Sequence, residues 1–331
     1  MRICLLTPQD LAEPFGADDW PCDPRPFVPD ATWHVETLEK SSSVRTVRRL
    51  AREGFDVFFN LCDGTAECDV PGIEVVRALE RLEVPFTGAT SEFYEPSRVQ
   101  MKRVCRRLGI PTPAYVLARN ERDVERAAAK LRYPLIVKHH CSYASVDLSR
   151  ASRVVSEAGL RRQAAKMMRR HGAALIEEFI EGTECTVLVA EVPGRPEHPR
   201  SYPPIQYRFP PGESFKHERI KFVDYEQMEA SPVTDRRLAR RLRDVSARLF
   251  VALKGAGFGR CDIRVDAEGT PWMLEINANC GIYFPPDSYG GADLCLAQDP
   301  EGHVGFTRRL IAASLWRHRR RRRGAGRGRE R

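Results

Sequence analysis

Short apolar runs alternate with amphipathic stretches along the first 95 residues. Three runs predict short buried strands: RICLLT (2–7), FDVFFNL (55–61) and VPFTG (84–88). Between them, residues 35–53 and 71–83 repeat apolar side chains at helical spacing. Strands that alternate with helices favour a doubly wound parallel sheet, so we expect an N-terminal α/β unit over residues 1–95.

The pattern changes near residue 96, where a second unit begins. A helix over 97–109 ends at Gly109 and Pro111. The segments that follow predict a strand at 133–140, an Arg-rich helix at 157–171, and strands at 173–180 and 184–192. We therefore assign residues 96–192 to a central α+β unit.

Seven prolines within residues 193–212 interrupt the periodic pattern. Beyond them lie a polar loop, a helix that begins near residue 236, a hairpin over 257–282 and a final helix at 302–316. We assign residues 193–316 to a C-terminal α+β unit. No internal repeat is visible.

The hairpin carries polar side chains where apolar ones would pack more easily. Strict alternation places Arg260, Asp262 and Arg264 on one face of the first arm. On the second arm it places Met273, Glu275 and Asn277 on one face, and Trp272, Leu274 and Ile276 on the other. A turn at residues 266–269 brings Asp262 roughly opposite Glu275, about 5 Å away between Cβ atoms.

Two carboxylates at this separation repel each other unless a cation lies nearby. Asp262, Glu275 and the amide of Asn277 offer hard oxygen ligands of the kind that suit Mg²⁺ or Mn²⁺. Because Mg²⁺ usually keeps water and phosphate oxygens in its other positions, we interpret this face as the floor of a nucleotide site. The alternative is a solvated sheet face with incidental charges.

The positive charge of the chain is concentrated at its end. Residues 317–331 contain nine arginines and one glutamate, which equals the whole net charge of +8, so residues 1–316 are formally neutral. Composition predicts a disordered Arg-rich tail over 317–331. It is either a solvated extension, an arm that binds RNA or another acidic surface, or a nuclear localisation run.

The remaining composition is that of an ordinary globular protein. The ten cysteines are scattered singly and form no CxxC pair, which favours reduced thiols and a cytoplasmic location. No apolar run approaches the ~20 residues that span a bilayer, so we expect no membrane partner. Nucleic acid remains a partner through the tail only, and a homodimer is left open.

Several strings resemble, in order and spacing, the ATP-grasp superfamily, and specifically D-alanine–D-alanine ligase-like proteins. They are FNLCDG (59–64), VPFTG (84–88), GIPTP (109–113), PLIVK (134–138), LIEEFIEGTE (175–184), GRCDIRVDAEG (259–269) and LEINANCG (274–281), spread over about 220 residues. The resemblance implies an ATP-grasp fold of three α/β or α+β units, with ATP as co-substrate clamped between the middle and last.

The resemblance also implies roles for individual residues. Asp262, Glu275 and Asn277 match the Mg²⁺ ligands; Lys138 and Arg98 match lysines that contact ATP; Glu177, Glu178, Phe179 and Ile180 match the adenine segment; Glu184 matches the ribose carboxylate; and Leu274 matches an adenine-packing residue. Lys138 at a sheet edge and Leu274 in a core also have ordinary structural explanations.

Four further residues are matched to the chemical step. Arg260 and backbone groups near Gly281 correspond to the donors that stabilise a tetrahedral oxyanion, and Lys221 to a lysine that closes over the γ-phosphate. Ser145 is the best match to a serine in the phosphate loop. The implied reaction is ATP-dependent joining of a small carboxylate to an amine, both amino-acid-like, through an acyl phosphate. The alternative explanation for Lys221 is that it is simply a solvated lysine in a loop.

The sequence departs from the family pattern in the substrate half. The loop at 139–149 contains no glycine, Phe222 replaces a tyrosine, and residues 5–20 lack the Gly-rich stretch that binds the first D-alanine. The segment after Gly281 also differs. D-alanine is therefore a weaker expectation than ligase chemistry. The competing hypotheses are a catalytically inactive ATP-grasp protein with a polyanion-binding tail and, resting on the tail alone, an RNA-associated protein.

Overall fold

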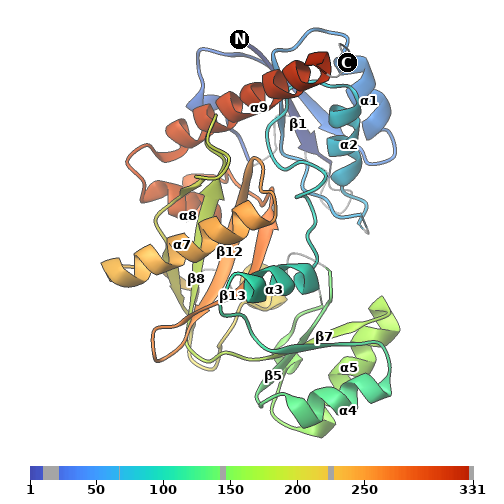
Figure 1. Ribbon diagram of the computed structural model, residues 1–331, viewed down its shortest axis with the longest axis vertical. Helices are drawn as coiled ribbons and strands as arrows, with labels where there is room; N and C mark the ends of the chain where they lie inside the picture. The colour runs from blue at the N-terminus through green and yellow to red at the C-terminus, as the bar shows by residue number, and fades with distance from the viewer. Residues whose placement is uncertain (10–21, 67, 142–146, 223–226, 328–331) are drawn as a thin grey trace.

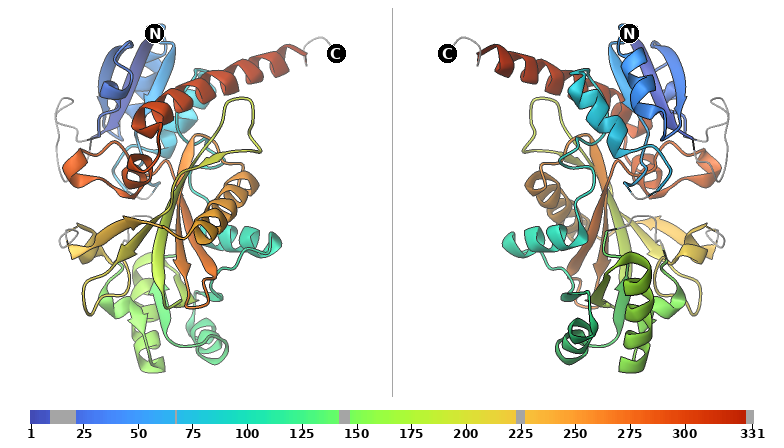
Figure 2. Two further views of the ribbon diagram at one scale, coloured as in Figure 1. Left: turned by 90° about the vertical axis from the view of Figure 1, so that its left-hand side faces the viewer. Right: turned by 90° about the vertical axis from the view of Figure 1, so that its right-hand side faces the viewer.

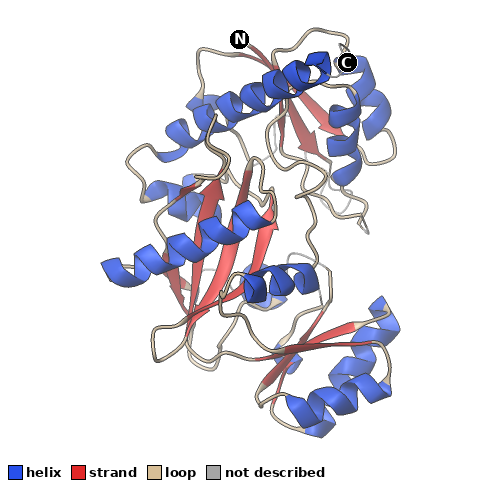
Figure 3. Cartoon of the chain, viewed as in Figure 1, coloured by secondary structure: helices blue, strands red, loops and turns tan. Residues whose placement is uncertain are grey.

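The computed structural model describes residues 1–331 with the exception of 10–21, 67, 142–146, 223–226 and 328–331. Three sheets follow one another along the long axis of the molecule, each with its own helices (Figure 1; Figure 3). Within the described ranges, no helix is both long and apolar enough to cross a membrane.

The N-terminal sheet is parallel, with strand order β2-β1-β3. Its strands are β1 (Arg2–Pro8), β2 (Thr32–Leu38) and β3 (Val57–Asn60), and its helices are α1 (Ser43–Leu50) and α2 (Ile73–Arg81). Cys4 and Leu6 face α1 and α2, whereas Ile3 and Leu5 pack against a helix from the far end of the chain, α9 (Gly302–Arg327). Helices therefore cover both faces, as predicted for a doubly wound unit.

The helix predicted over residues 35–53 is wrong in its first part. Residues 32–38 form β2, which pairs in parallel with β1 from Arg2↔Thr32 to Pro8↔Leu38, and the helix begins only at Ser43. The segment TWHVETL is rich in β-branched and aromatic residues. Its pairing with the buried strand β1 over seven positions outweighs the helical spacing of its apolar residues.

The middle of the chain forms an antiparallel four-stranded sheet with order β4-β7-β5-β6. Its strands are β4 (Tyr115–Ala118), β5 (Leu135–Lys138), β6 (Arg153–Val154) and β7 (Ala174–Glu178). Helices α4 (Glu121–Lys130) and α5 (Glu157–His171) close one face around Leu135, Val137 and Ile176.

The C-terminal sheet is antiparallel, with order β11-β10-β8-β12-β13 and β9 paired to β8. Its strands are β8 (Thr183–Ala190), β9 (Arg200–Ser201), β10 (Ile205–Arg208), β11 (Glu229–Pro232), β12 (Phe258–Val265) and β13 (Pro271–Ala278). The remaining helices of this region are α3 (Arg98–Arg107), α6 (Glu218–Phe222), α7 (Arg236–Ala252) and α8 (Gly291–Ala297).

Two segments that the sequence places in the central unit pack with the C-terminal sheet. Strand β8 hydrogen-bonds to β12 along its whole length, and α3 joins α7 over the apolar face of this sheet. The expected boundary at residue 192 therefore does not separate the two sheets. At the β7–β8 turn, Gly182 has φ 133° and a Cβ would lie 2.0 Å from the carbonyl oxygen of Val265, so glycine is required there.

The prediction of a disordered tail at 317–331 is wrong for residues 317–327, which continue α9 without a break. Arg317 forms an ion pair with Glu191 and donates to the carbonyl oxygen of Phe86 at 2.8 Å. These contacts hold the helix against the body of the protein beyond the predicted boundary at Trp316. Residues 328–331 lie outside the described part of the chain.

Candidate active site

The hairpin β12–β13 forms the floor of a cavity that faces β5 and β7 of the four-stranded sheet. Asp262 pairs with Glu275 across the two strands, as predicted, and Gly269 in the turn has φ 73°. The register shifts after Asp262, however, because Ile263 pairs with Met273 and leaves Leu274 as an extra residue.

This bulge overturns the strict alternation expected for the second arm. Met273 lies in the hydrophobic core beside Ile276, whereas Leu274 and Glu275 both line the cavity. Without the extra residue, Leu274 and Glu275 would point to opposite faces. The bulge therefore places the residue matched to adenine packing and a residue matched to metal binding on the same side.

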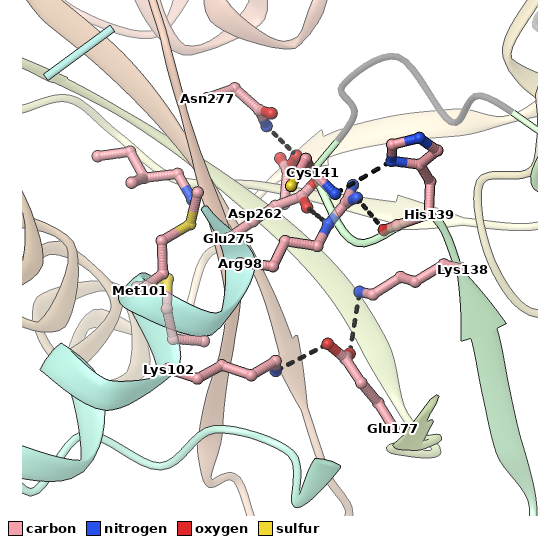
Figure 4. A network of polar contacts seen from close by, with 12 residues as sticks. Arg98, Met101, Lys102, Lys138, His139, Cys141, Glu177, Asp262, Glu275 and Asn277 are labelled. Carbon is pink, nitrogen blue, oxygen red and sulfur yellow. Dashed lines mark hydrogen bonds and ion pairs between the residues drawn. The ribbon is translucent and has the colours of Figure 1, made fainter. Parts of the chain in front are cut away.

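Asp262 is held by three neighbours on the cavity floor. Arg260 donates to both of its oxygens, from Nε at 3.1 Å and from Nη2 at 3.0 Å. Thr186 of β8 donates to Asp262 at 2.9 Å. The Nδ2 of Asn277 also donates to Asp262 at 2.9 Å (Figure 4). Burial by itself would raise the pKa of Asp262, but Arg260 and Lys216 outweigh it and lower the pKa to about 2.

Glu275 has its own cation. The Nε of Arg98, in the first turn of α3, lies 2.6 Å from Glu275 Oε2, and Nη1 of the same side chain donates to the carbonyl oxygen of His139 at 2.7 Å (Figure 4). Burial would raise the pKa of Glu275, whereas Arg98 and then Lys138 lower it. The repulsion expected between Asp262 and Glu275 is thus offset by two arginines.

A chain of three buried charges holds Lys138 at the end of β5. The carboxylate of Glu177 accepts Lys138 Nζ at 2.9 Å on one oxygen and lies 3.1 Å from Lys102 Nζ with the other (Figure 4). Lys102 comes from α3, so the chain joins the four-stranded sheet to a helix that packs on the C-terminal sheet. Glu177 thus holds Lys138 in position through an ion pair.

The segment after Glu177, residues Glu178 to Ile180, lines the cavity on the side opposite the hairpin. Glu178 pairs with Arg132, and the Phe179 ring lies between Arg153 and Arg264, whose guanidinium carbons are 4.9 and 4.7 Å from its centroid. The carbonyl oxygen of Ile180 accepts a hydrogen bond from Arg264 at 2.9 Å.

Of the fifteen site residues predicted from the sequence, twelve line this one cavity. They are Arg98, Lys138, Glu177, Glu178, Phe179, Ile180, Glu184, Arg260, Asp262, Leu274, Glu275 and Asn277. Gly281 follows β13 and packs against the ring of Phe284 rather than lining the cavity. Lys221 lies in α6, with its side chain outside the described part of the structure, and Ser145 falls within the undescribed residues 142–146.

Lys216 is a cavity residue that sequence reasoning missed. Its Nζ lies 3.3 Å from Glu184 Oε1 and 3.2 Å from the ring centroid of Tyr207, on the strand next to β8. Burial would lower the pKa of Lys216, but Tyr207, Glu184 and Asp262 raise it, so the ammonium stays charged. The only sequence feature that could have pointed to Lys216 is that it is a second lysine in the polar loop that contains Lys221.

Lys102 and Arg264 were also missed. Neither belongs to a matched string as a functional residue, and their partners lie far away in the chain: Glu177 for Lys102, and Glu184 with the Ile180 carbonyl for Arg264. Only the packing of the two sheets shows that Arg264 lines the cavity and that Lys102 lies behind it, in contact with Glu177.

A charged cavity between two antiparallel sheets, floored by two carboxylates and an amide and walled by lysines and arginines, is the arrangement of an ATP-grasp enzyme. Sequence comparison narrows the class. The family described as D-ala D-ala ligase C-terminus matches residues 104–283, more than half of the chain, and the chain belongs to this D-alanine–D-alanine ligase family.

Individual relatives agree with this assignment. The D-alanine–D-alanine ligase of Bordetella petrii is 29% identical over 240 residues, which cover 72% of this chain and 71% of the relative. The D-alanine–D-alanine ligase of Pseudomonas fluorescens is 30% identical over 240 residues, which cover 71% of this chain and 69% of the relative.

Solved structures show the same fold. The VanG D-Ala:D-Ser ligase of Enterococcus faecalis superimposes with a TM-score of 0.71 at 14% identity, covering 95% of this chain and 99% of that one. The D-alanine–D-alanine ligase of Bacillus anthracis complexed with ATP gives a TM-score of 0.69 at 16% identity, and the match covers 97% of this chain and 99% of that one. The chain is thus an ATP-dependent ligase with an ATP-grasp fold, as the sequence predicts.

Proposed function

We propose that this ligase joins a small, amino-acid-like carboxylate to a small amine through an acyl phosphate. The observation that carries the proposal is the position of Arg260, whose guanidinium lies on the cavity floor beside Asp262 and two residues from it on β12. A cation at this place can stabilise negative charge that develops on the substrate carbonyl oxygen.

The reaction has two steps. A carboxylate oxygen attacks the γ-phosphorus of ATP, the bond to the bridging oxygen breaks, and ADP leaves with that electron pair. The amine then attacks the acyl carbon, loses a proton, and expels phosphate to give the amide. Phosphorylation is needed because a carboxylate otherwise has only oxide as its leaving group.

The cavity residues divide this work. Lys138, oriented by Glu177, and Lys216, beside Glu184, supply positive charge for the phosphates. Glu184, which lines the same cavity, would accept hydrogen bonds from the ribose hydroxyls of ATP. Arg260 acts after phosphoryl transfer, on the oxyanion of the tetrahedral intermediate, where a preorganised donor stabilises the transition state more than the ground state.

We further propose that Asp262, Glu275 and Asn277 bind Mg²⁺. The donor set fits this ion, since it offers two carboxylates and an amide oxygen, and Asn277 uses only its Nδ2 to contact Asp262. Both carboxylates have a lowered pKa and are ionised at neutral pH. When bound, Mg²⁺ would neutralise charge on the β- and γ-phosphate oxygens.

D-alanine is expected to be a poor substrate. Support comes from the altered segments around the acid and amine, namely the N-terminal stretch without the family's Gly-rich motif, Phe222, and the sequence IYFPPDSYGG after Gly281. A cytoplasmic location is supported by the ten cysteines, all free thiols and eight of them buried.

The experiment is a screen for ADP and phosphate release from Mg²⁺ and ATP with pairs of amino acids, D-alanine among them. Turnover with a defined pair supports the proposal and names the substrates. Rapid D-alanyl-D-alanine synthesis would contradict the expectation about D-alanine, and MgATP binding without turnover on any pair would favour the catalytically inactive alternative.

A further inference from the structure

The last helix, α9, changes character along its length. Its first four turns are amphipathic and bury Phe306, Leu310 and Ile311 against the N-terminal sheet. From Arg319 to Arg323 every residue is an exposed arginine. Figure 2 shows this end of α9 projecting beyond the N-terminal unit, on the opposite side of the molecule from the four-stranded sheet.

The arginines of this end do not all face the same way. Successive residues of a helix are about 100° apart. Arg317, Arg321 and Arg322 lie on the side that faces the body, where they border a groove with Glu80 and Glu83 from the end of α2. That side therefore has acidic residues of the protein close by.

The outward side of the same turns has a different composition. Arg319 and Arg323 are one turn apart on this side, and Arg320 lies between them with its guanidinium carbon 5.3 Å from the ring centroid of Trp316. None of these three arginines borders the groove with Glu80 and Glu83. The outward face, defined as Trp316, Arg319, Arg320 and Arg323, is a cationic stripe with one aromatic side chain.

We propose that this outward face binds double-stranded DNA through its phosphates. Like charges one helical turn apart destabilise a helix, so a polyanion that neutralises Arg319 and Arg323 would also stabilise the end of α9. The projecting helix has the dimensions that the major groove of a duplex admits, with phosphates along both walls. Residues 1–316 are formally neutral, so the attraction is concentrated at this end of the chain.

The composition of the helix end argues against a membrane surface as the partner. A helix that lies in a membrane interface needs an apolar face along its length, and residues 317–323 contain no apolar side chain. Arg319, Arg320 and Arg323 on the outward face instead suit a partner whose phosphates line that side of the helix.

The test measures binding of a fluorescently labelled 20-base-pair duplex to the full-length protein by anisotropy, between 50 and 200 mM salt. With three phosphates contacted, affinity should fall roughly 40-fold over this range through counterion release. The paired variant Arg319→Gln/Arg323→Gln should bind at least about tenfold more weakly at 50 mM salt and show a shallower salt slope.

The matched control is Arg321→Gln/Arg322→Gln, which removes the same charge from the body-facing side and should weaken binding less than about threefold. Equal losses in the two variants would overturn the assignment to the outward face. Absence of duplex binding by the wild type, or equal binding to phosphatidylserine vesicles, would overturn the choice of partner. Melting temperatures confirm that each variant is folded, and MgATP affinity should be the same in all.

Discussion

Lys102 and Glu177 form an ion pair with 3.1 Å between Nζ and Oε1, and neither side chain exposes more than 1% of its surface. Glu177 also binds Lys138, so one carboxylate lies between two ammonium groups. Burial would raise the pKa of Glu177, but Lys102 and Lys138 lower it; burial lowers the pKa of Lys102. Lys138, which we propose to contact phosphate, is thus held in place through Glu177 by a residue from another layer of the molecule.

Glu177→Gln should destabilise the protein by about 3–5 kcal/mol at pH 7, because it leaves two buried ammonium groups without their anion. Since the pKa of Glu177 is lowered in the folded state, its contribution is present above the unfolded glutamate value of about 4.3 and is lost as the pH falls through the folded value. Urea denaturation from pH 7 to pH 3 should show the wild-type advantage shrinking below about pH 4.

The control is Glu181→Gln, which removes an exposed surface partner of Arg153 and should change stability by less than about 1 kcal/mol. An advantage of the wild type over Glu177→Gln that stays constant down to pH 3 would show that the carboxylate charge is not what stabilises the fold.

Glu275→Gln and Asn277→Ala should each weaken Mg²⁺-dependent ATP binding and abolish turnover, as isothermal calorimetry and product assays can measure. Repulsion between neighbouring carboxylates alone would make metal-free Glu275→Gln more stable than wild type. Because Arg98 pairs with Glu275 at 2.6 Å, we expect the opposite, a loss of stability. The exposed turn variant Glu268→Gln serves as control, and unchanged MgATP affinity in both site variants would exclude a metal site here.

Arg260→Ala should lower kcat for amide formation by about 10²–10³, the usual cost of one donor to an oxyanion. ATP affinity should change far less, because the developing charge exists only in the transition state. Steady-state kinetics together with ATP titration separate the two effects. Arg208→Ala, which removes a highly exposed arginine of β10, should leave both unchanged. Robust turnover by Arg260→Ala would remove this residue from the mechanism.

Lys216→Met should raise the KM for ATP by at least about tenfold, since a charge-assisted contact to phosphate contributes roughly 1.5–3 kcal/mol. Lys216→Arg should recover part of this loss because it keeps the charge. The exposed variant Lys254→Met provides the control for a general loss of positive charge. A KM equal to that of the wild type would mean that Lys216 serves only Glu184 and Tyr207.

The local features of the site could be predicted because they depend on neighbours in the sequence. The turn at 266–269, the pairing of Asp262 with Glu275, and the helix over 157–171 follow from turn chemistry and from periods of two and 3.6 residues. The bulge at Leu274 could not be predicted, because one extra residue in a strand is stabilised by packing on both faces rather than by a local motif.

The sequence by itself determined an N-terminal α/β unit with strands near 2–7 and 55–61, the carboxylates and amide of the cavity floor, and the family. Only the tertiary structure decided that β8 joins the C-terminal sheet and that Arg98 meets Glu275 across 177 positions. It also decided that Lys216 lines the cavity and that Lys102 pairs with Glu177 behind it. It also decided that α9 covers the first strand and carries its arginines outward as a helix. The physical reason is that local patterns encode backbone period and turn geometry, whereas the partner of a buried charge is fixed by how distant elements pack.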